Sequence, residues 1–152
     1  DATKGSRSVQ RKVAAGKFPF FSPGGVNVVH VDDVIYCLKN IYQKGHPGER
    51  YIVASDNLTI KDLFTQISEV AGVPAPRYYL PKAALHLLGF IGDNLLGPLG
   101  VKGPLSGETA YTSSMYHWFS SEKAQKELGW TPRPSKEAIT ESIEWMLNNG
   151  FA

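Results

Sequence analysis

A glycine turn at residues 24–25 leads into the most regular hydrophobic pattern of the chain. The positions after it are β-branched valines, which predict a buried strand: Val26, Val28, Val29 and Val31. Beyond them, apolar residues recur at helical spacing, at positions 34, 38 and 41. Asp32 or Asp33 is expected to cap this helix by accepting a hydrogen bond from its free N–H groups. A strand, a cap and a helix in this order are typical of α/β proteins.

The same periodicities predict the other elements. Further helices are expected over residues 6–16, 59–72, 82–89, 122–128 and 135 to about 148. Their starts carry capping residues, among them Thr59, with Asp62 three residues on, Ser120 or Ser121, and Ser135. Short extended segments are expected at residues 18–21, 50–54 and 78–80. The sequence therefore predicts an α/β fold with about five helices and three or four short strands.

Two stretches have hydrophobic residues without a clear period. Residues 90–107 are rich in glycine and leucine, which suits either a mobile wall over an apolar ligand or a plain surface connection. Residues 108–119 hold a dense aromatic group that includes Tyr111, Tyr116 and Trp118. This group is interpreted either as core packing under a long loop or as a wall that faces a ligand.

Composition narrows the classes of protein. Of the 152 residues, 42% are hydrophobic and 20% charged, which is ordinary for one globular domain. A net charge of +2 gives no reason to expect nucleic acid or an anionic membrane as partner. Apolar runs are too short to span a bilayer. The single cysteine, Cys37, excludes a disulfide framework and fits a reducing, cytoplasmic compartment, where we expect it in the core. Five basic residues within positions 1–17 form either a solvated helix face or an anion site.

No complete set of catalytic residues is recognised. The four histidines are scattered and lack zinc-ligand spacing, so no metal site is predicted. Neither a nucleophile elbow nor a phosphate-binding loop is present. Capping explains Asp32 and Asp33 better than catalysis, because adjacent side chains diverge where a strand meets a helix. His30 lies inside the apolar strand, either as a satisfied core histidine or in contact with a substrate or a partner lobe.

Three stretches form a recognisable ordered set. They are Asn-Val-Val-His-Val-Asp-Asp-Val at 27–34, Gly-Glu-Arg-Tyr-Ile-Val with Asn-Leu-Thr within 48–59, and Ser-Glu-Lys-Ala with Glu-Leu-Gly-Trp-Thr-Pro within 121–132. In order and spacing they resemble the C-terminal half of the extended short-chain dehydrogenases/reductases, the NAD-dependent epimerase/dehydratase family. The resemblance covers nearly the whole chain. It implies the C-terminal part of a Rossmann-type fold.

In that family the N-terminal half carries the glycine fingerprint and the catalytic residues, which include a Tyr-x-x-x-Lys pair. We therefore expect residues 1–152 to be a fragment that holds the substrate-binding lobe and the strands that complete the parent sheet, without catalytic residues. The parent enzyme would use NAD or NADP, which the fragment alone would not bind. Without its N-terminal half, the lobe is expected to expose strand edges and to form a homo-oligomer.

The resemblance also suggests the substrate. Family members that bind nucleotide-sugars commonly place an arginine where this sequence has Val26. The apolar stretch 82–107 is similar instead to the dihydroflavonol reductase and 3β-hydroxysteroid dehydrogenase branches, which take apolar ketones or alcohols. The candidate substrate-binding residues are His30, Leu85, Leu88, Tyr111 and Tyr116.

Two alternatives remain. One is a nucleotide-sugar epimerase or dehydratase whose anion-binding residues are Arg7, Arg11 or Arg77. The other is a non-catalytic binding domain.

Overall fold

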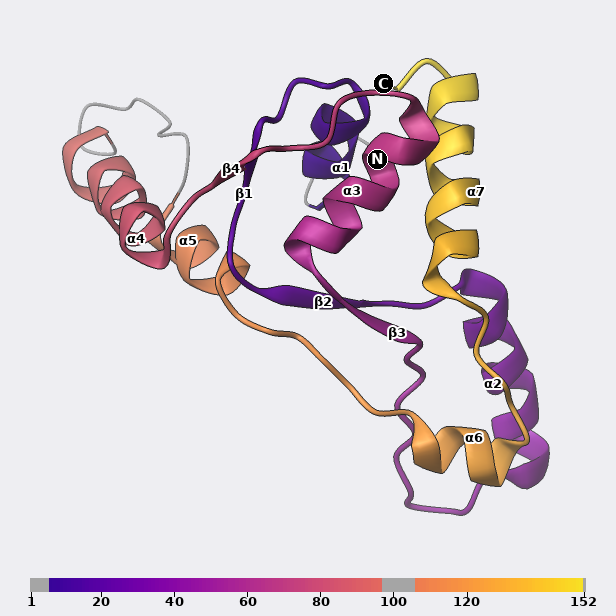
Figure 1. The fold of residues 1–152 in the computed structure, drawn as a ribbon. Helices are drawn as coiled ribbons and strands as arrows, with labels where there is room; N and C mark the ends of the chain where they lie inside the picture. The colour runs from indigo at the N-terminus through magenta and orange to yellow at the C-terminus, as the bar shows by residue number, and fades with distance from the viewer. Residues whose placement is uncertain (1–5, 97–105, 152) are drawn as a thin grey trace.

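The computed structural model describes residues 6–96 and 106–151 (Figure 1). The helices are α1 Ser6–Ala14, α2 Val31–Lys44, α3 Ile60–Ala71, α4 Lys82–Ile91, α5 Gly107–Ser113, α6 Glu122–Leu128 and α7 Ser135–Asn148. A π-helical turn, Gly92–Leu96, extends α4. The strands are β1 Phe20–Phe21, β2 Gly25–Val28, β3 Asp56–Thr59 and β4 Tyr78–Tyr79. The predicted α/β class is confirmed, and α5 is a helix that the hydrophobic pattern did not indicate.

The main hydrophobic core lies where α1, α3 and α7 pack together (Figure 1). Its buried residues are Val13, Ala14, Leu63, Phe64, Ile67, Ile139, Ile143 and Met146. In α7, the buried residues Ile139, Ile143 and Met146 have the i, i+4, i+7 spacing that keeps side chains on one face of a helix, whereas Leu147 is exposed.

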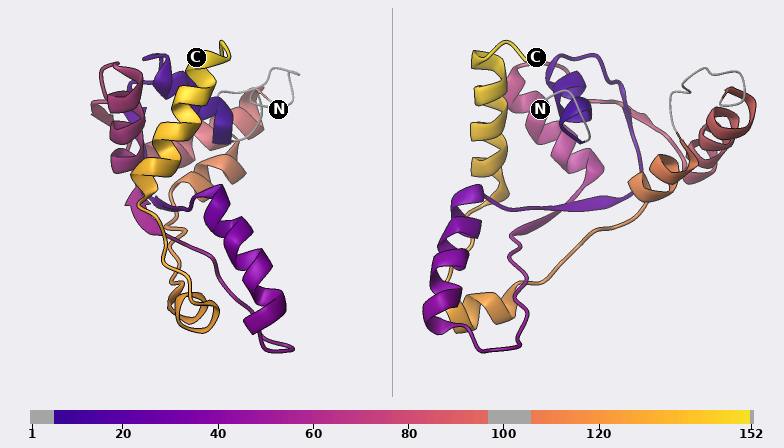
Figure 2. Two further views of the ribbon diagram at one scale, coloured as in Figure 1. Left: turned by 90° about the vertical axis from the view of Figure 1, so that its right-hand side faces the viewer. Right: turned by 180° about the vertical axis from the view of Figure 1, so that it is seen from behind.

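Two small ribbons connect this core to the rest of the chain. β2 and β3 pair antiparallel, with Gly25 opposite Thr59 and Val28 opposite Asp56. β1 and β4 pair parallel, with Phe20 opposite Tyr78. Both views in Figure 2 show α2 and α6 at one end of the molecule, and its right-hand view shows α4 and α5 projecting from another side. The β2–β3 ribbon runs between these two ends (Figure 1).

The predicted strand at residues 50–54 does not form. These residues carry no regular secondary structure, and among the described segments none pairs with them. Tyr51 and Val53 nevertheless pack, together with Val29, against a second cluster made of Cys37, Ala124, Leu128 and Trp130. A strand needs a neighbour that accepts and donates its backbone hydrogen bonds. The segment therefore has the hydrophobic pattern of a strand without a partner.

The caps of two helices also differ from those expected. The helix α2 begins two or three residues earlier than predicted, and His30 is its N-cap, because its Nδ1 accepts a hydrogen bond from the Asp32 N–H at 3.1 Å. Ser135 is the first residue of α7 rather than its cap, and its N–H donates to Asp56 Oδ2 at 2.7 Å. The predicted Thr59 cap of α3 is confirmed, with its Oγ1 3.1 Å from the Asp62 N–H.

Candidate functional site

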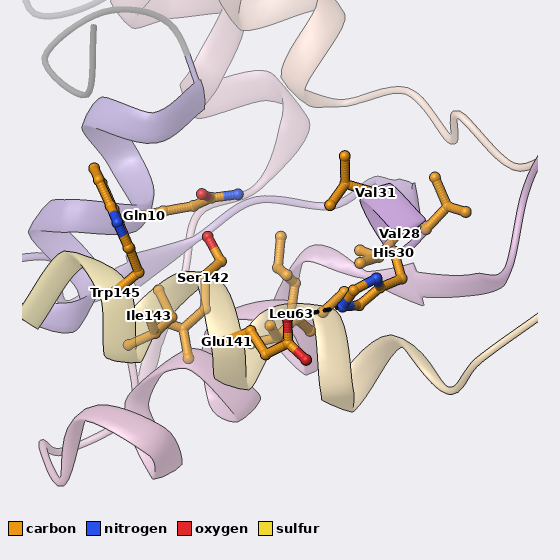
Figure 3. A pocket seen from close by; sticks show the side chains of 13 residues that line it. Gln10, Val28, His30, Val31, Leu63, Glu141, Ser142, Ile143 and Trp145 are labelled. Carbon is orange, nitrogen blue, oxygen red and sulfur yellow. Dashed lines mark hydrogen bonds and ion pairs between the residues drawn. The ribbon is translucent and has the colours of Figure 1, made fainter. Parts of the chain in front are cut away.

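His30 lies at the junction of the β2 ribbon and α2, and its imidazole is buried, with 3% of its surface exposed. One ring nitrogen, Nδ1, accepts the Asp32 N–H, and Arg133 Nη1 lies 3.3 Å from the same atom. The other, Nε2, is 2.9 Å from Glu141 Oε2 on α7 (Figure 3). Because Nδ1 serves as an acceptor, the geometry assigns the ring proton to Nε2, which donates it to the Glu141 carboxylate.

Arg133 connects His30 to a buried carboxylate. Its Nε lies 3.3 Å from Asp33 Oδ1, and its backbone N–H donates to Asp33 Oδ2 at 2.9 Å. Asp33 is only 4% exposed, so this carboxylate depends on Arg133 for compensation of its charge. The segment before α7 is thereby held against the first turn of α2. These contacts make His30 and Asp33 structural partners of Arg133.

A cavity of about 590 Å³ opens beside His30 (Figure 3). Apolar side chains from β2, α3 and α7 make up most of its lining, with Val28, Leu63 and Ile143 among them. Gln10 of α1 and Glu141 of α7 add polar groups. The arrangement suits an apolar group that carries a few hydrogen-bonding atoms.

The predicted residues Leu85, Leu88 and Tyr111 come together in a helix pair. α4 packs against α5 with close backbone approach at Gly89, where a Cβ would lie 2.8 Å from the Gly107 Cα. Leu85 is buried in this contact and Leu88 is half-buried. Tyr111 is exposed on α5, and its ring lies 6.4 Å from that of His86, centroid to centroid.

Tyr116 lies three residues beyond α5 and belongs to an extended segment, residues 115–119, which we call the aromatic segment. Gly25 donates to the Met115 carbonyl at 3.0 Å and accepts from the His117 N–H at 2.8 Å. The large side chains of the aromatic segment are all exposed, namely Met115, Tyr116, Trp118 and Phe119. The interpretation as core packing is therefore wrong for these residues within this chain.

His30 and Tyr116 lie at opposite ends of β2. Tyr116 is bridged to Gly25, the first residue of the strand, whereas His30 follows its last residue by two positions. Both nitrogens of His30 are engaged within the chain, so a contact with substrate would have to replace the Glu141 bond. This contact stays a prediction.

The arginines considered for anion binding belong to separate elements. Arg7 and Arg11 lie on α1, and Arg77 immediately precedes β4 with its side chain exposed. Part of the glycine-rich stretch, residues 97–105, lies outside the described residues. In the remainder of the chain, no group of three or more His, Cys, Asp or Glu side chains could hold a metal ion. No helix in that part is both long and apolar enough to cross a membrane.

Comparison with known proteins identifies the relatives of this chain. No family model matches it. A putative dihydroflavonol 4-reductase from Synechocystis is 24% identical over 139 residues, which cover 89% of this chain and 40% of that protein. The short-chain dehydrogenase/reductase family 42E member 1 of Mus musculus is 31% identical over 140 residues, covering 82% of this chain and 34% of that protein. Among solved structures, gox2253 superimposes with a TM-score of 0.76 at 34% identity, covering 95% of this chain and 44% of that one.

These similarities support the extended short-chain dehydrogenase/reductase family for this chain. It spans about two-fifths of the length of the relatives it matches. A nucleoside-diphosphate-sugar epimerase from Pseudomonas aeruginosa shares the fold, with a TM-score of 0.68 at 24% identity.

Against the pattern of this family, Tyr78 and Lys82 have the four-residue separation of the Tyr-x-x-x-Lys pair. Tyr78 lies in β4, and Lys82 is the first residue of α4, with Pro81 as its N-cap. A strand residue and a helix residue on either side of a proline do not share one helix face. The chain thus contains the spacing of this pair without its geometry.

Sequence reasoning missed Glu141 and Arg133 as partners of His30, and it quoted Asn57 within the Asn-Leu-Thr motif without giving it a role. The Asn57 amide bonds both backbone groups of Phe119, donating to its carbonyl at 3.1 Å and accepting from its N–H at 3.1 Å. A signal for Asn57 exists, because an asparagine at a strand position is unusual. No local signal indicates Glu141 or Arg133, since both lie more than 100 residues from His30 in sequence.

Proposed function

We propose that this chain is the substrate-binding part of an NAD(P)-dependent oxidoreductase of the short-chain dehydrogenase/reductase family, and that the whole enzyme acts on an apolar ketone or alcohol. The observation that carries the proposal is the apolar surface of the α4–α5 pair, where Leu87, Phe90 and Tyr111 are exposed. Surfaces of this kind are covered by ligands or partners in functional proteins. The chain continues from α5 into the aromatic segment, and we propose that the exposed side chains of both form one apolar wall for the substrate.

A second surface supports the view that this part works with another half. One face of α2 exposes apolar side chains at helical spacing, with Val31 65%, Ile35 43%, Leu38 64% and Tyr42 93% exposed. We call these four residues the α2 stripe. Residues 50–54 lie in the same part of the molecule as a strand pattern without a partner. We propose that the N-terminal half of the whole enzyme covers the α2 stripe and pairs with residues 50–54.

The N-terminal half then binds NAD or NADP, and this cofactor supplies or accepts the hydride. The residues of this chain bind and orient the substrate, and they exclude water from its apolar part.

A nucleotide-sugar substrate is the second candidate, because relatives of known structure include the P. aeruginosa nucleoside-diphosphate-sugar epimerase. The diphosphate of such a substrate requires positive charge. Arg7, Arg11 or Arg77 would have to supply it, since Val26 stands on β2 where the resemblance expects arginine. The apolar side chain of Val26 at this position favours the apolar substrate.

The test uses the full-length protein that contains this chain. Thermal unfolding is measured with NAD(P), alone and together with a panel of apolar ketones or of nucleotide-sugars, and turnover is followed by NAD(P)H absorbance. Stabilisation and turnover with apolar ketones are expected. Stabilisation by nucleotide-sugars only would replace this proposal by the epimerase function. Ligand binding without NAD(P) binding or turnover would identify a non-catalytic binding domain.

A further inference from the structure

We infer that Tyr116 and Trp118 select a substrate with a planar, aromatic or conjugated ring. This inference rests on the proposed function and names the substrate class for its apolar wall. The aromatic segment brings the two side chains together, with their ring centroids 4.8 Å apart and their planes at 71°. Tyr116 is 56% and Trp118 47% exposed, so each ring keeps about half of its surface free for a ligand.

The backbone of the aromatic segment is fixed at both ends. Its first half is bonded to Gly25, through the Met115 carbonyl and the His117 N–H. Its last residue, Phe119, is bonded twice to the side-chain amide of Asn57. The Asn57 Oδ1 also accepts from Asn27 at 2.8 Å, so the amide itself is oriented. These bonds hold the backbone of the segment at residues 115, 117 and 119 against β2 and β3.

Gly25 is required for the position of the rings. A Cβ at this residue would lie 2.2 Å from Trp118 Nε1 and 2.8 Å from Tyr116 Cδ1. The indole can therefore lie against the backbone of β2 only because the side chain at position 25 is a hydrogen. Its Nε1 points to the Leu58 carbonyl at 3.4 Å, on the neighbouring strand β3. Both rings are thus held against the β2–β3 ribbon by contacts within the chain.

Two aromatic rings that are held in place in this way favour planar ligands. Side chains that are held in place lose little conformational entropy when a ligand binds. An edge-to-face pair of aromatic rings offers one ring face and one ring edge, and a further aromatic ring gains about 0.5–1.5 kcal/mol from such contacts beyond the area that it buries. A saturated, puckered ring of the same size gains the area term only. Unlike the α2 stripe, which is largely aliphatic and lies near the unpaired residues 50–54, this surface lies on a backbone that is bonded to β2 and β3.

The inference is tested on the full-length enzyme with two ketones of similar size, one aryl and one saturated alicyclic. The Trp118→Leu variant keeps an apolar side chain but removes the ring. It is expected to lower kcat/KM for the aryl ketone by about three- to tenfold, while the alicyclic ketone is affected by less than about twofold. The Gly25→Ala variant should also lower kcat/KM for the aryl ketone relative to kcat/KM for the alicyclic ketone, because it displaces the indole without removing it.

Phe20→Leu is the matched control, since Phe20 is also about half exposed but packs against Tyr78 across the β1–β4 pair. It should leave the ratio between the two ketones unchanged. Equal losses for both ketones in Trp118→Leu, or no loss for either, would overturn the inference while the proposed function stands.

Binding of the aryl ketone is also measured directly, by equilibrium dialysis. If the protein binds the aryl ketone without turning it over, and Trp118→Leu weakens this binding, the inference is supported and the proposed function is wrong. If the full-length protein neither binds nor turns over the aryl ketone, both fail.

Discussion

The imidazole Nε2 of His30 donates a hydrogen bond to Glu141, at 2.9 Å, across 111 positions of the sequence. The same ring caps α2 through Nδ1, so one buried side chain joins the start of α2 to the middle of α7. A neutral imidazole with one donor and one acceptor is suited to this double role. The two contacts can be separated by substitution.

Asparagine and glutamine each replace one of the two hydrogen bonds that the His30 imidazole makes. His30→Asn places an amide oxygen near the position of Nδ1 and keeps a good N-cap, whereas His30→Gln places its amide near Nε2 and gives a poor cap. We expect His30→Asn to retain more stability than His30→Gln, by about 1 kcal/mol, because a helix cap is worth that amount and Glu141 is largely solvent-exposed. Urea unfolding measures the difference.

Glu141→Gln should change the free energy of unfolding by less than about 0.5 kcal/mol, because its amide oxygen still accepts from Nε2. Glu144→Gln, one turn along the exposed face of α7, is the control. A His30→Gln variant that equals or exceeds His30→Asn in stability would show that the contact with Glu141 outweighs the cap.

Arg133 compensates the buried Asp33 carboxylate. Arg133→Met keeps much of the apolar stem and removes the charge, which leaves Asp33 with the backbone N–H of residue 133 as a remaining donor. We expect a loss of about 2–3 kcal/mol in the free energy of unfolding. The Arg133→Met, Asp33→Asn double variant should recover part of this loss, because no buried charge remains. Arg77→Met, at an exposed position, serves as the control. Equal stability of Arg133→Met and the wild type would contradict this role.

The elements that could be predicted from the sequence are those whose signals are local. In α3, Thr59 and Asp62 mark the start, Gly72 marks the end, and the structure has this helix with Gly72 at a φ of 67°. The expected position of Cys37 in the core is likewise confirmed. Aromatic density in the sequence singles out Tyr111 and Tyr116, and both side chains are exposed in the structure.

What could not be predicted depends on contacts between distant residues. Two carboxylates after a strand look like helix caps, but Asp33 binds Arg133, which is 100 positions away, and His30 takes over the cap. Residues 50–54 have the hydrophobic pattern of a strand, but a pattern cannot reveal whether a partner is present. The aromatic segment is recognisable by composition, whereas its attachment to Gly25 and Asn57 follows only from the pairing of β2 with β3.

The α2 stripe predicts self-association of the isolated chain. Apolar side chains that protrude this far into water are covered when a second copy is present at sufficient concentration. We expect dimers or larger species in light scattering at high protein concentration. Leu38→Glu, in the middle of the α2 stripe, should shift the chain toward monomer without a change in its circular dichroism spectrum. Lys39→Glu, on the neighbouring position of the same helix, is the control. A wild-type chain that stays monomeric at high concentration would contradict this expectation.

Burial raises the pKa of the Cys37 thiol, and the nearby Asp33 carboxylate raises it further. In the unfolded chain the thiol ionises near its ordinary value of about 8.5. Above that pH the folded state holds the thiol proton more tightly than the unfolded state does, so stability falls as pH rises through this range. We expect unfolding midpoints in urea to decline from neutral pH toward alkaline pH, and to decline less steeply in Cys37→Ala, although this variant is less stable throughout because it leaves a cavity.

The pKa values of Tyr51 and Lys123 are raised as well, by the hydrogen bonds to Glu127 and Glu49 respectively. Both groups ionise at higher pH than the thiol, so their effect begins later in the titration. Parallel declines in the wild type and in Cys37→Ala would assign the alkaline loss of stability to groups other than Cys37.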